Sequence, residues 1–137
     1  MKLNDMLAYK VAMLSNDLSQ SLASIYRPFG LSMPEWRVVA TLGNNNAMLS
    51  KNIAIATRLD KVQISRALQQ LENKRLVTRM ASERDKRAVN VALSEKGKNI
   101  FNEITPLVSQ WQAEKIKNIT ADEYNTFLKV MNSLSDE

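Results

Sequence analysis

The sequence predicts a mainly α-helical fold with a small β element of two or three strands in its second half. Apolar residues recur at steps of three and four over most of the 137 residues, the period of an amphipathic helix. Between about residues 76 and 93 this period changes to two, which is typical of short strands. Glycine and proline number three each, too few for the many tight turns of an all-β fold.

The first half of the chain predicts three helices separated by turn residues. The first, from about Asn4 to Tyr26, carries one apolar stripe, formed by Leu7, Val11, Leu14, Leu18, Leu22 and Ile25. The turn residues of "RPFG" end it, and Ser32 is placed to cap a second helix over about 33–42. After "GNNN", a short alanine-rich helix covers about Ser50 to Thr57.

A fourth helix follows, with its start signalled by a capping box. Asp60 is a favourable N-cap residue, and Gln63 stands three positions later, so we expect a helix to about Lys74. Two strand candidates, "LVTRM" and "AVNVAL", then flank "ASERDKR", with Val89, Val91 and Leu93 on one face of the second. A two-stranded ribbon with a protruding charged loop fits this pattern.

Two further helices complete the chain. Ser94 is placed to cap a long helix that Pro106 interrupts, and Thr120 to cap the last one. Their apolar positions are Ile100, Ile104, Leu107, Val108 and Trp111, and then Tyr124, Phe127, Leu128, Met131 and Leu134. The central order of elements matches a winged helix-turn-helix, and the length predicts a single domain over residues 1–137.

Composition excludes several classes of function. Without cysteine there is no disulfide, thiolate zinc site or thiol switch, and without histidine the commonest general base and metal ligand is missing. No glycine-rich phosphate loop or nucleophile elbow occurs, so we expect no catalytic residue, metal or cofactor. No apolar run is long enough to span a membrane and no signal peptide is apparent, which makes a cytoplasmic location the default.

The positive charge is concentrated in the middle of the chain. Residues 51–98 hold 12 lysines and arginines against 5 acidic residues, whereas the rest of the chain holds 7 against 9. A clustered basic region is typical of a protein that binds a polyanion such as nucleic acid. Charge alone fits a solvated basic surface equally well.

The outward face of the fourth helix favours the nucleic-acid interpretation. Ile64, Leu68 and Leu71 mark its inner face, and the outward residues with base-reading or phosphate-binding chemistry are Lys61, Val62, Gln63, Ser65, Arg66 and Gln69. Arginine can bond guanine, glutamine can read adenine, and a valine methyl can contact the thymine methyl. A merely solvated face would more often pair Glu with Lys. For Gln63, base contact and helix capping remain equal alternatives.

The charged loop between the strands allows two interpretations. Most charged loop tips are inert, but this one follows a polar helix face. Arg84, Lys86 and Arg87 would then lie beside the DNA backbone, and an arginine can enter a narrow minor groove. The Asp85 carboxylate would repel the DNA phosphates, so its expected role is to hold a neighbouring arginine in an extended rotamer.

Four segments in order resemble successive motifs of the MarR family of bacterial transcription regulators: "LSMPEWRVVATL", "LDKVQISRALQQLENKRLVTRM", "ERDKRAVNVALSEKG" and "ITPLV". The resemblance covers residues 30–108 by motif. It implies a homodimer whose terminal helices, within 1–30 and 100–137, form the interface. Two winged helix-turn-helix lobes, each over 33–98, would grip a pseudo-palindromic operator. Lys61, Ser65 and Arg66 fall on the recognition-helix motif, and Asp85 and Arg87 on the wing motif.

The chain departs from the family pattern at several points. Val62 and Gln63 stand where Ser or Thr is frequent, and Arg75 replaces the usual glycine before the first wing strand, which questions a left-handed helix end there. The missing cysteine and histidine argue against peroxide-sensing and zinc-responsive branches.

The first hypothesis is therefore a dimeric, sequence-specific regulator of transcription, most often a repressor in this family. Control by a small aromatic or phenolic ligand is implied by resemblance, in a pocket near Trp36 and Arg37, although for Trp36 itself a plain core position is favoured over a ligand contact. An architectural, non-specific DNA-binding protein is the second hypothesis, and a module that binds an acidic protein partner is the third. An enzyme is a distant fourth.

Overall fold

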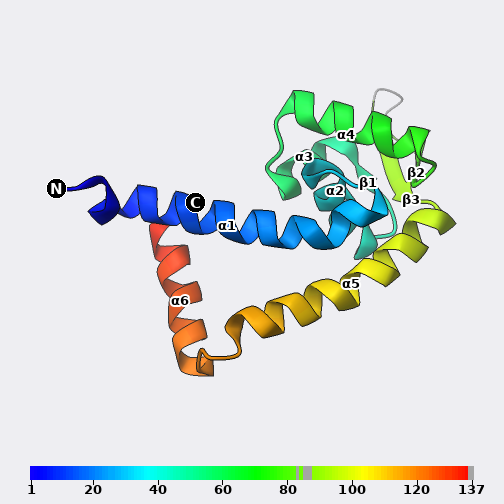
Figure 1. The fold of residues 1–137 in the computed structure, drawn as a ribbon. Coiled ribbons are helices and arrows are strands. Elements are labelled where there is room, and N and C mark those ends of the chain that lie inside the picture. The colour runs from blue at the N-terminus through cyan, green and yellow to red at the C-terminus, as the bar shows by residue number, and fades with distance from the viewer. Residues whose placement is uncertain (83, 85–87, 136–137) are drawn as a thin grey trace.

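The computed structural model describes residues 1–82, 84 and 88–135 and places the predicted helices and strands in the predicted order (Figure 1). The elements are η1 (Leu3–Asp5), α1 (Leu7–Tyr26), η2 (Arg27–Phe29), α2 (Met33–Gly43), β1 (Met48–Leu49), α3 (Ser50–Thr57), α4 (Lys61–Asn73), β2 (Val77–Ala81), β3 (Val89–Leu93), α5 (Glu95–Ile116) and α6 (Ala121–Leu134). The chain is thus mainly helical with a small antiparallel sheet, the winged helix-turn-helix architecture.

Side-chain caps begin four of the helices, as the sequence predicts. Ser32, Asp60, Ser94 and Thr120 each accept a hydrogen bond from the backbone N–H three residues later. Each such cap satisfies a helix N–H that has no partner within the helix and contributes about 1 kcal/mol. At the start of α3 the cap position is held by Leu49, whose side chain has no acceptor atom.

The sheet has three strands in the order β1-β3-β2, all antiparallel. The β2–β3 hairpin is the predicted ribbon, with Val77 opposite Leu93. The additional strand, β1, pairs with the outer side of β3, where Met48 lies opposite Val91. The prediction of two or three strands is therefore confirmed, although the place of β1 was not predicted, because a two-residue strand is too short to show an alternating pattern.

The prediction that Pro106 interrupts the long helix was wrong. Helix α5 runs from Glu95 to Ile116 with Pro106 inside it. Proline removes one backbone hydrogen bond, and tertiary packing can compensate for that loss. Ile104, two residues earlier, is fully buried in the core and anchors this part of α5.

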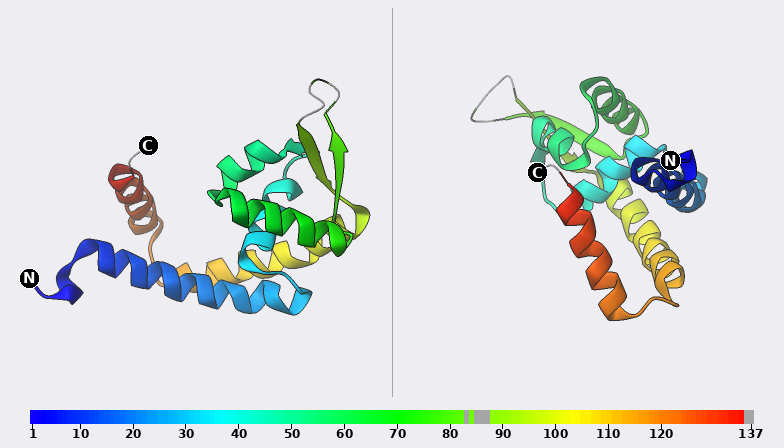
Figure 2. Two further views of the ribbon diagram at one scale, coloured as in Figure 1. Left: turned by 90° about the horizontal axis from the view of Figure 1, so that it is seen from above. Right: turned by 90° about the vertical axis from the view of Figure 1, so that its left-hand side faces the viewer.

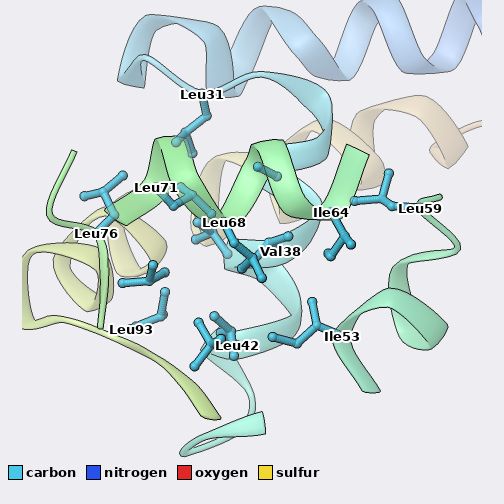
Figure 3. Close-up of a cluster of buried hydrophobic side chains, with 14 of the residues drawn as sticks. Leu31, Val38, Leu42, Ile53, Leu59, Ile64, Leu68, Leu71, Leu76 and Leu93 are labelled. Atoms are coloured by element: carbon cyan, nitrogen blue, oxygen red, sulfur yellow. The ribbon is translucent and has the colours of Figure 1, made fainter. Parts of the chain in front are cut away.

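The core lies within the lobe formed by α2, α3, α4 and the sheet, where the labelled leucine, isoleucine and valine side chains point toward one another (Figure 3). Its fully buried members include Val38 and Leu42 from α2, Ile53 from α3 and Leu71 from α4. The inner face predicted for α4 is buried as expected. This packing holds α4 against the lobe with its other face outward.

The long helices extend beyond the lobe, and α6 stands apart from it in Figure 1 and in the left view of Figure 2. Only the last part of α1 contributes to the core, through Ala23 and Tyr26. No residue of α6, all of which the structure describes, is buried. The Thr120 backbone N–H donates to the Glu123 carboxylate and lowers the pKa of that group.

Candidate DNA-binding surface

Helix α4 presents one continuous polar face to solvent. Its exposed residues include Lys61, Val62, Ser65, Arg66, Gln69, Gln70 and Asn73. The Val62 side chain is an aliphatic group in the first turn of this face and is 65% exposed. The same residues line a shallow depression along the helix. All the outward positions that the sequence predicts for reading DNA are thus brought together on one accessible surface, apart from Gln63.

Gln63 lies at the edge of this face, half-buried, and takes part in the capping box of α4. Its side-chain oxygen accepts the Asp60 N–H at 3.2 Å, while its own N–H donates to the Asp60 carboxylate at 2.7 Å. A bidentate contact to adenine needs both the oxygen and the nitrogen of a glutamine amide. The cap and the base contact therefore compete for the same oxygen atom.

One turn further along, the amides of α4 interact with each other. The Gln69 Nε2 donates to Asn73 Oδ1 at 3.1 Å, an i,i+4 pair on the exposed surface. This contact orients the Gln69 side chain along the helix and reduces its rotamer freedom. An oriented amide loses less conformational entropy when it binds a base edge.

The wing is described only in part. The β2–β3 hairpin projects from the lobe beside α4 (Figure 2, left). At its end Arg84 is exposed, and its backbone N–H donates to Ser82 Oγ at 3.3 Å. Asp85, Lys86 and Arg87 lie outside the described residues, so their predicted roles remain predictions.

Across the part of the chain that the structure describes, no cluster of three or more His, Cys, Asp or Glu side chains could hold a metal ion. Within the same residues, no helix is long and apolar enough to cross a membrane.

Comparison with known proteins identifies this arrangement. The model of the MarR family matches residues 31–89, which include α2, α3, α4 and the wing. Over residues 31–89 the chain is similar to the MarR family. The resemblance predicted from the sequence motifs is confirmed.

Solved structures of MarR-family regulators share the fold over nearly the whole chain. A mutant of MarR from E. coli complexed with operator DNA superposes with a TM-score of 0.85 at 24% identity, covering 93% of this chain and 92% of that one. A MarR family transcriptional regulator from Silicibacter pomeroyi DSS-3 gives a TM-score of 0.79 at 25% identity, with coverages of 96% and 98%. The likeness therefore includes the long helices outside residues 31–89.

Helix α4 ends in a left-handed turn that contains no glycine. Arg75 has φ of 62°, the Leu76 N–H donates to the Leu71 carbonyl, and the Arg75 N–H donates to that of Glu72. These two bonds form a Schellman motif, completed by the buried Leu71 and Leu76 side chains. The left-handed end is thus retained despite the arginine, at a steric cost that glycine would avoid.

The residues predicted for a ligand pocket lie on α2. Trp36 is half-buried and stacks on Tyr26, with ring centroids 6.0 Å apart and planes inclined by 12°. Arg37 is exposed beside it. A depression of about 810 Å³ lies elsewhere, between the end of α1, η2 and α5; its lining includes Ile25, Phe29, Leu107, Trp111 and Lys115, and neither predicted residue.

An ion pair at the far end of α4 was missed by the sequence analysis. Glu35 is a buried carboxylate, 3% exposed, and its Oε2 lies 2.6 Å from the Lys74 ammonium. The spacing of Ser32 and Glu35 signals a capping box, which the structure contains. No sequence signal connects Glu35 with Lys74, 39 residues away.

Proposed function

We propose that this protein is a sequence-specific DNA-binding regulator of transcription that binds a pseudo-palindromic operator as a homodimer. The observation that carries the proposal is the outward face of α4. It is exposed, held by a rigid capped helix against a packed lobe, and contains no carboxylate before Glu72. The E. coli relative of the same fold was solved with operator DNA, which supports this surface as the DNA-binding one.

The chemistry of the face divides into base reading and phosphate binding. Arg66 at mid-helix has the planar donors that bond guanine O6 and N7, and Val62 offers methyl groups to thymine. Gln69 is suited to adenine on the same basis. Lys61 and Ser65 lie in the first turns, where the helix dipole also favours an anion, so we assign them to phosphate.

Homodimerisation is supported by the apolar surface that one chain leaves uncovered. On α1, four residues of the predicted stripe, Leu7, Val11, Leu14 and Leu18, are between 37% and 58% exposed. On α6, Phe127 and Met131 are 47% and 49% exposed. An isolated helix of 14 residues is only marginally stable in water, so α6 needs a partner surface. A second copy provides matching surfaces and the two-fold symmetry of an inverted repeat.

Repression, with release by a small aromatic or phenolic ligand, is the regulatory mode that the family resemblance favours. The depression between α1 and α5 combines aromatic surface from Phe29 and Trp111 with the Lys115 ammonium, which lies 5.9 Å from the Trp111 ring centroid. An aromatic ring with an acidic group matches this lining. Quenching of tryptophan fluorescence by aromatic acids, compared between the wild type and Lys115→Met, tests the assignment.

Selection of bound sequences from a random duplex pool tests the main proposal. We expect an inverted repeat whose affinity exceeds that of random DNA by about 10³-fold or more at the same salt concentration. Recovery of no consensus would instead favour the architectural alternative. If the protein instead binds an acidic protein and duplex DNA does not compete with that binding, the interaction-module alternative is favoured.

The dimer is tested separately by one pair of substitutions on α6. Met131→Glu places a charge on the exposed apolar face, whereas Asn132→Glu places the same charge on the neighbouring polar face. We expect the first to yield monomers or aggregates with weak operator binding and the second to stay dimeric. Deletion of residues 120–137 should act like the first. A stable, normally binding dimer after this deletion would remove α6 from the interface.

A further inference from the structure

The end of α4 is bonded to both segments that join the lobe to the long helices. On one side, the Lys74 ammonium donates to Glu35 Oε2 at 2.6 Å and to the Gly30 carbonyl at 2.7 Å. Gly30, with φ of 80°, is the turn where the chain leaves η2 and enters the lobe. One side chain thus connects α4 to the point at which α1 and η2 join the lobe.

On the other side, the first residues of α5 contact the same end of α4. The Ser94 N–H donates to the Leu76 carbonyl at 2.9 Å, and Ser94 Oγ donates to the Arg75 carbonyl at 2.6 Å. The Lys96 ammonium lies 3.3 Å from the Lys74 carbonyl oxygen and donates to it. The carbonyl groups of the three residues that follow α4 therefore attach the start of α5.

The Glu35 carboxylate is the most constrained group in this network. Besides Lys74, its Oε1 accepts the Ser32 hydroxyl at 2.8 Å and the Ser32 backbone N–H at 3.3 Å. Burying an ion pair contributes little net stability, because desolvation offsets the attraction. Both oxygens of the Glu35 carboxylate have fixed hydrogen-bond partners, however, so the ion pair favours one placement of α2 relative to α4.

From these contacts we propose that Lys74 is a positioning residue that sets the angle between the DNA-reading helix and the long helices, and thereby the operator spacing that the protein accepts. The inference rests on the proposed dimeric DNA binding. In a dimer joined through the long helices, this angle determines the separation and relative rotation of the two α4 helices. Adding or removing one base pair between the half-sites moves one of them by about 3.4 Å and rotates it by about 34°. A dimer with a rigid connection between its α4 helices therefore binds an operator of altered spacing less tightly.

The test uses operators whose half-site spacing is the selected one or differs by one base pair. The measured quantity is the spacing ratio, which is the dissociation constant for the altered spacing divided by that for the selected spacing. A uniform loss of affinity from a missing positive charge cancels in this ratio. The main variant is Glu35→Gln with Lys74→Met, since glutamine can still accept from Ser32 and no unpaired buried charge is left. Lys98→Met is the matched control, because the Lys98 ammonium meets only the exposed Glu95 at 3.6 Å among the ion pairs described.

We expect the double variant to remain a folded dimer and its spacing ratio to fall by about three- to thirtyfold. Lys98→Met should leave the ratio unchanged, and Lys74→Arg, which keeps a cationic donor, should retain most of it. An unchanged ratio in the double variant, or an equal fall in Lys98→Met, would overturn the positioning role. Failure of the wild-type protein to prefer any operator would instead refute the underlying function.

Discussion

Gly97, in the first turn of α5, lies against the backbone of Leu76 just after α4, and replacing it with alanine tests that junction directly. A Cβ atom at this position would lie 2.1 Å from the Leu76 carbonyl oxygen and 3.2 Å from Leu93 Cδ2. The same carbonyl accepts the Ser94 N–H, so it cannot turn away without losing a buried hydrogen bond. We therefore expect α5 to shift away from the lobe in Gly97→Ala.

The magnitude follows from three contributions. Overpacking against backbone costs about 1–3 kcal/mol, and weakening the Ser94 bond adds about 1 kcal/mol. Alanine in a helix recovers about 1 kcal/mol relative to glycine. The net loss in free energy of unfolding is about 1–3 kcal/mol, which lowers Tm by roughly 3–15 °C for a chain of this size.

Thermal unfolding followed by circular dichroism, at one fixed protein concentration, measures this loss. Asn99→Ala is the control, because Asn99 is exposed two residues further along the same helix. There alanine should raise stability by a few tenths of a kcal/mol at most, about the propensity difference. A Gly97→Ala protein as stable as the wild type would show that the two segments do not approach as closely as described.

Three further predictions concern DNA reading, the left-handed turn and the wing. Arg66→Ala should cost about 1–3 kcal/mol on the selected operator and relax the preference at one position per half-site, as measured by fluorescence anisotropy. Equal losses on operator and random DNA would assign Arg66 to phosphate instead. Arg75→Gly removes the steric cost of a left-handed non-glycine residue, about 1–2 kcal/mol. It adds the conformational entropy cost of glycine, about 0.5–1 kcal/mol, which is smaller. Unfolding should therefore occur at a slightly higher temperature, and a lower one would contradict this account. Arg87→Ala should leave Tm and dimer mass unchanged, weaken binding most at A·T-rich flanks, and lower the salt slope by about one if a phosphate contact is lost. Asp85→Ala should also weaken binding, although removing a negative charge beside DNA would by simple electrostatics strengthen it; tighter binding would exclude the support role.

The sequence by itself determined the helices and the main hairpin, because their signals are local. A cap such as Asp60 with Gln63 acts within one helical turn, and helix α3 was predicted with both of its observed ends. The inner face of α4 follows from the helical period alone, and so does the outward face that carries Arg66. These features depend on residues within a few positions of each other, which a single chain displays without an alignment.

Tertiary structure alone decided the features that join distant segments. Strand β1 exists because Met48 and Leu49 pair with β3, and a two-residue strand has no pattern of its own. The left-handed Arg75 is held by hydrogen bonds and by the packing of Leu76, which override the preference for glycine. The Glu35–Lys74 pair and the approach of Gly97 to Leu76 each require two elements to be brought together first. Such contacts depend on the final placement of whole helices, so no local pattern of residues could have predicted them.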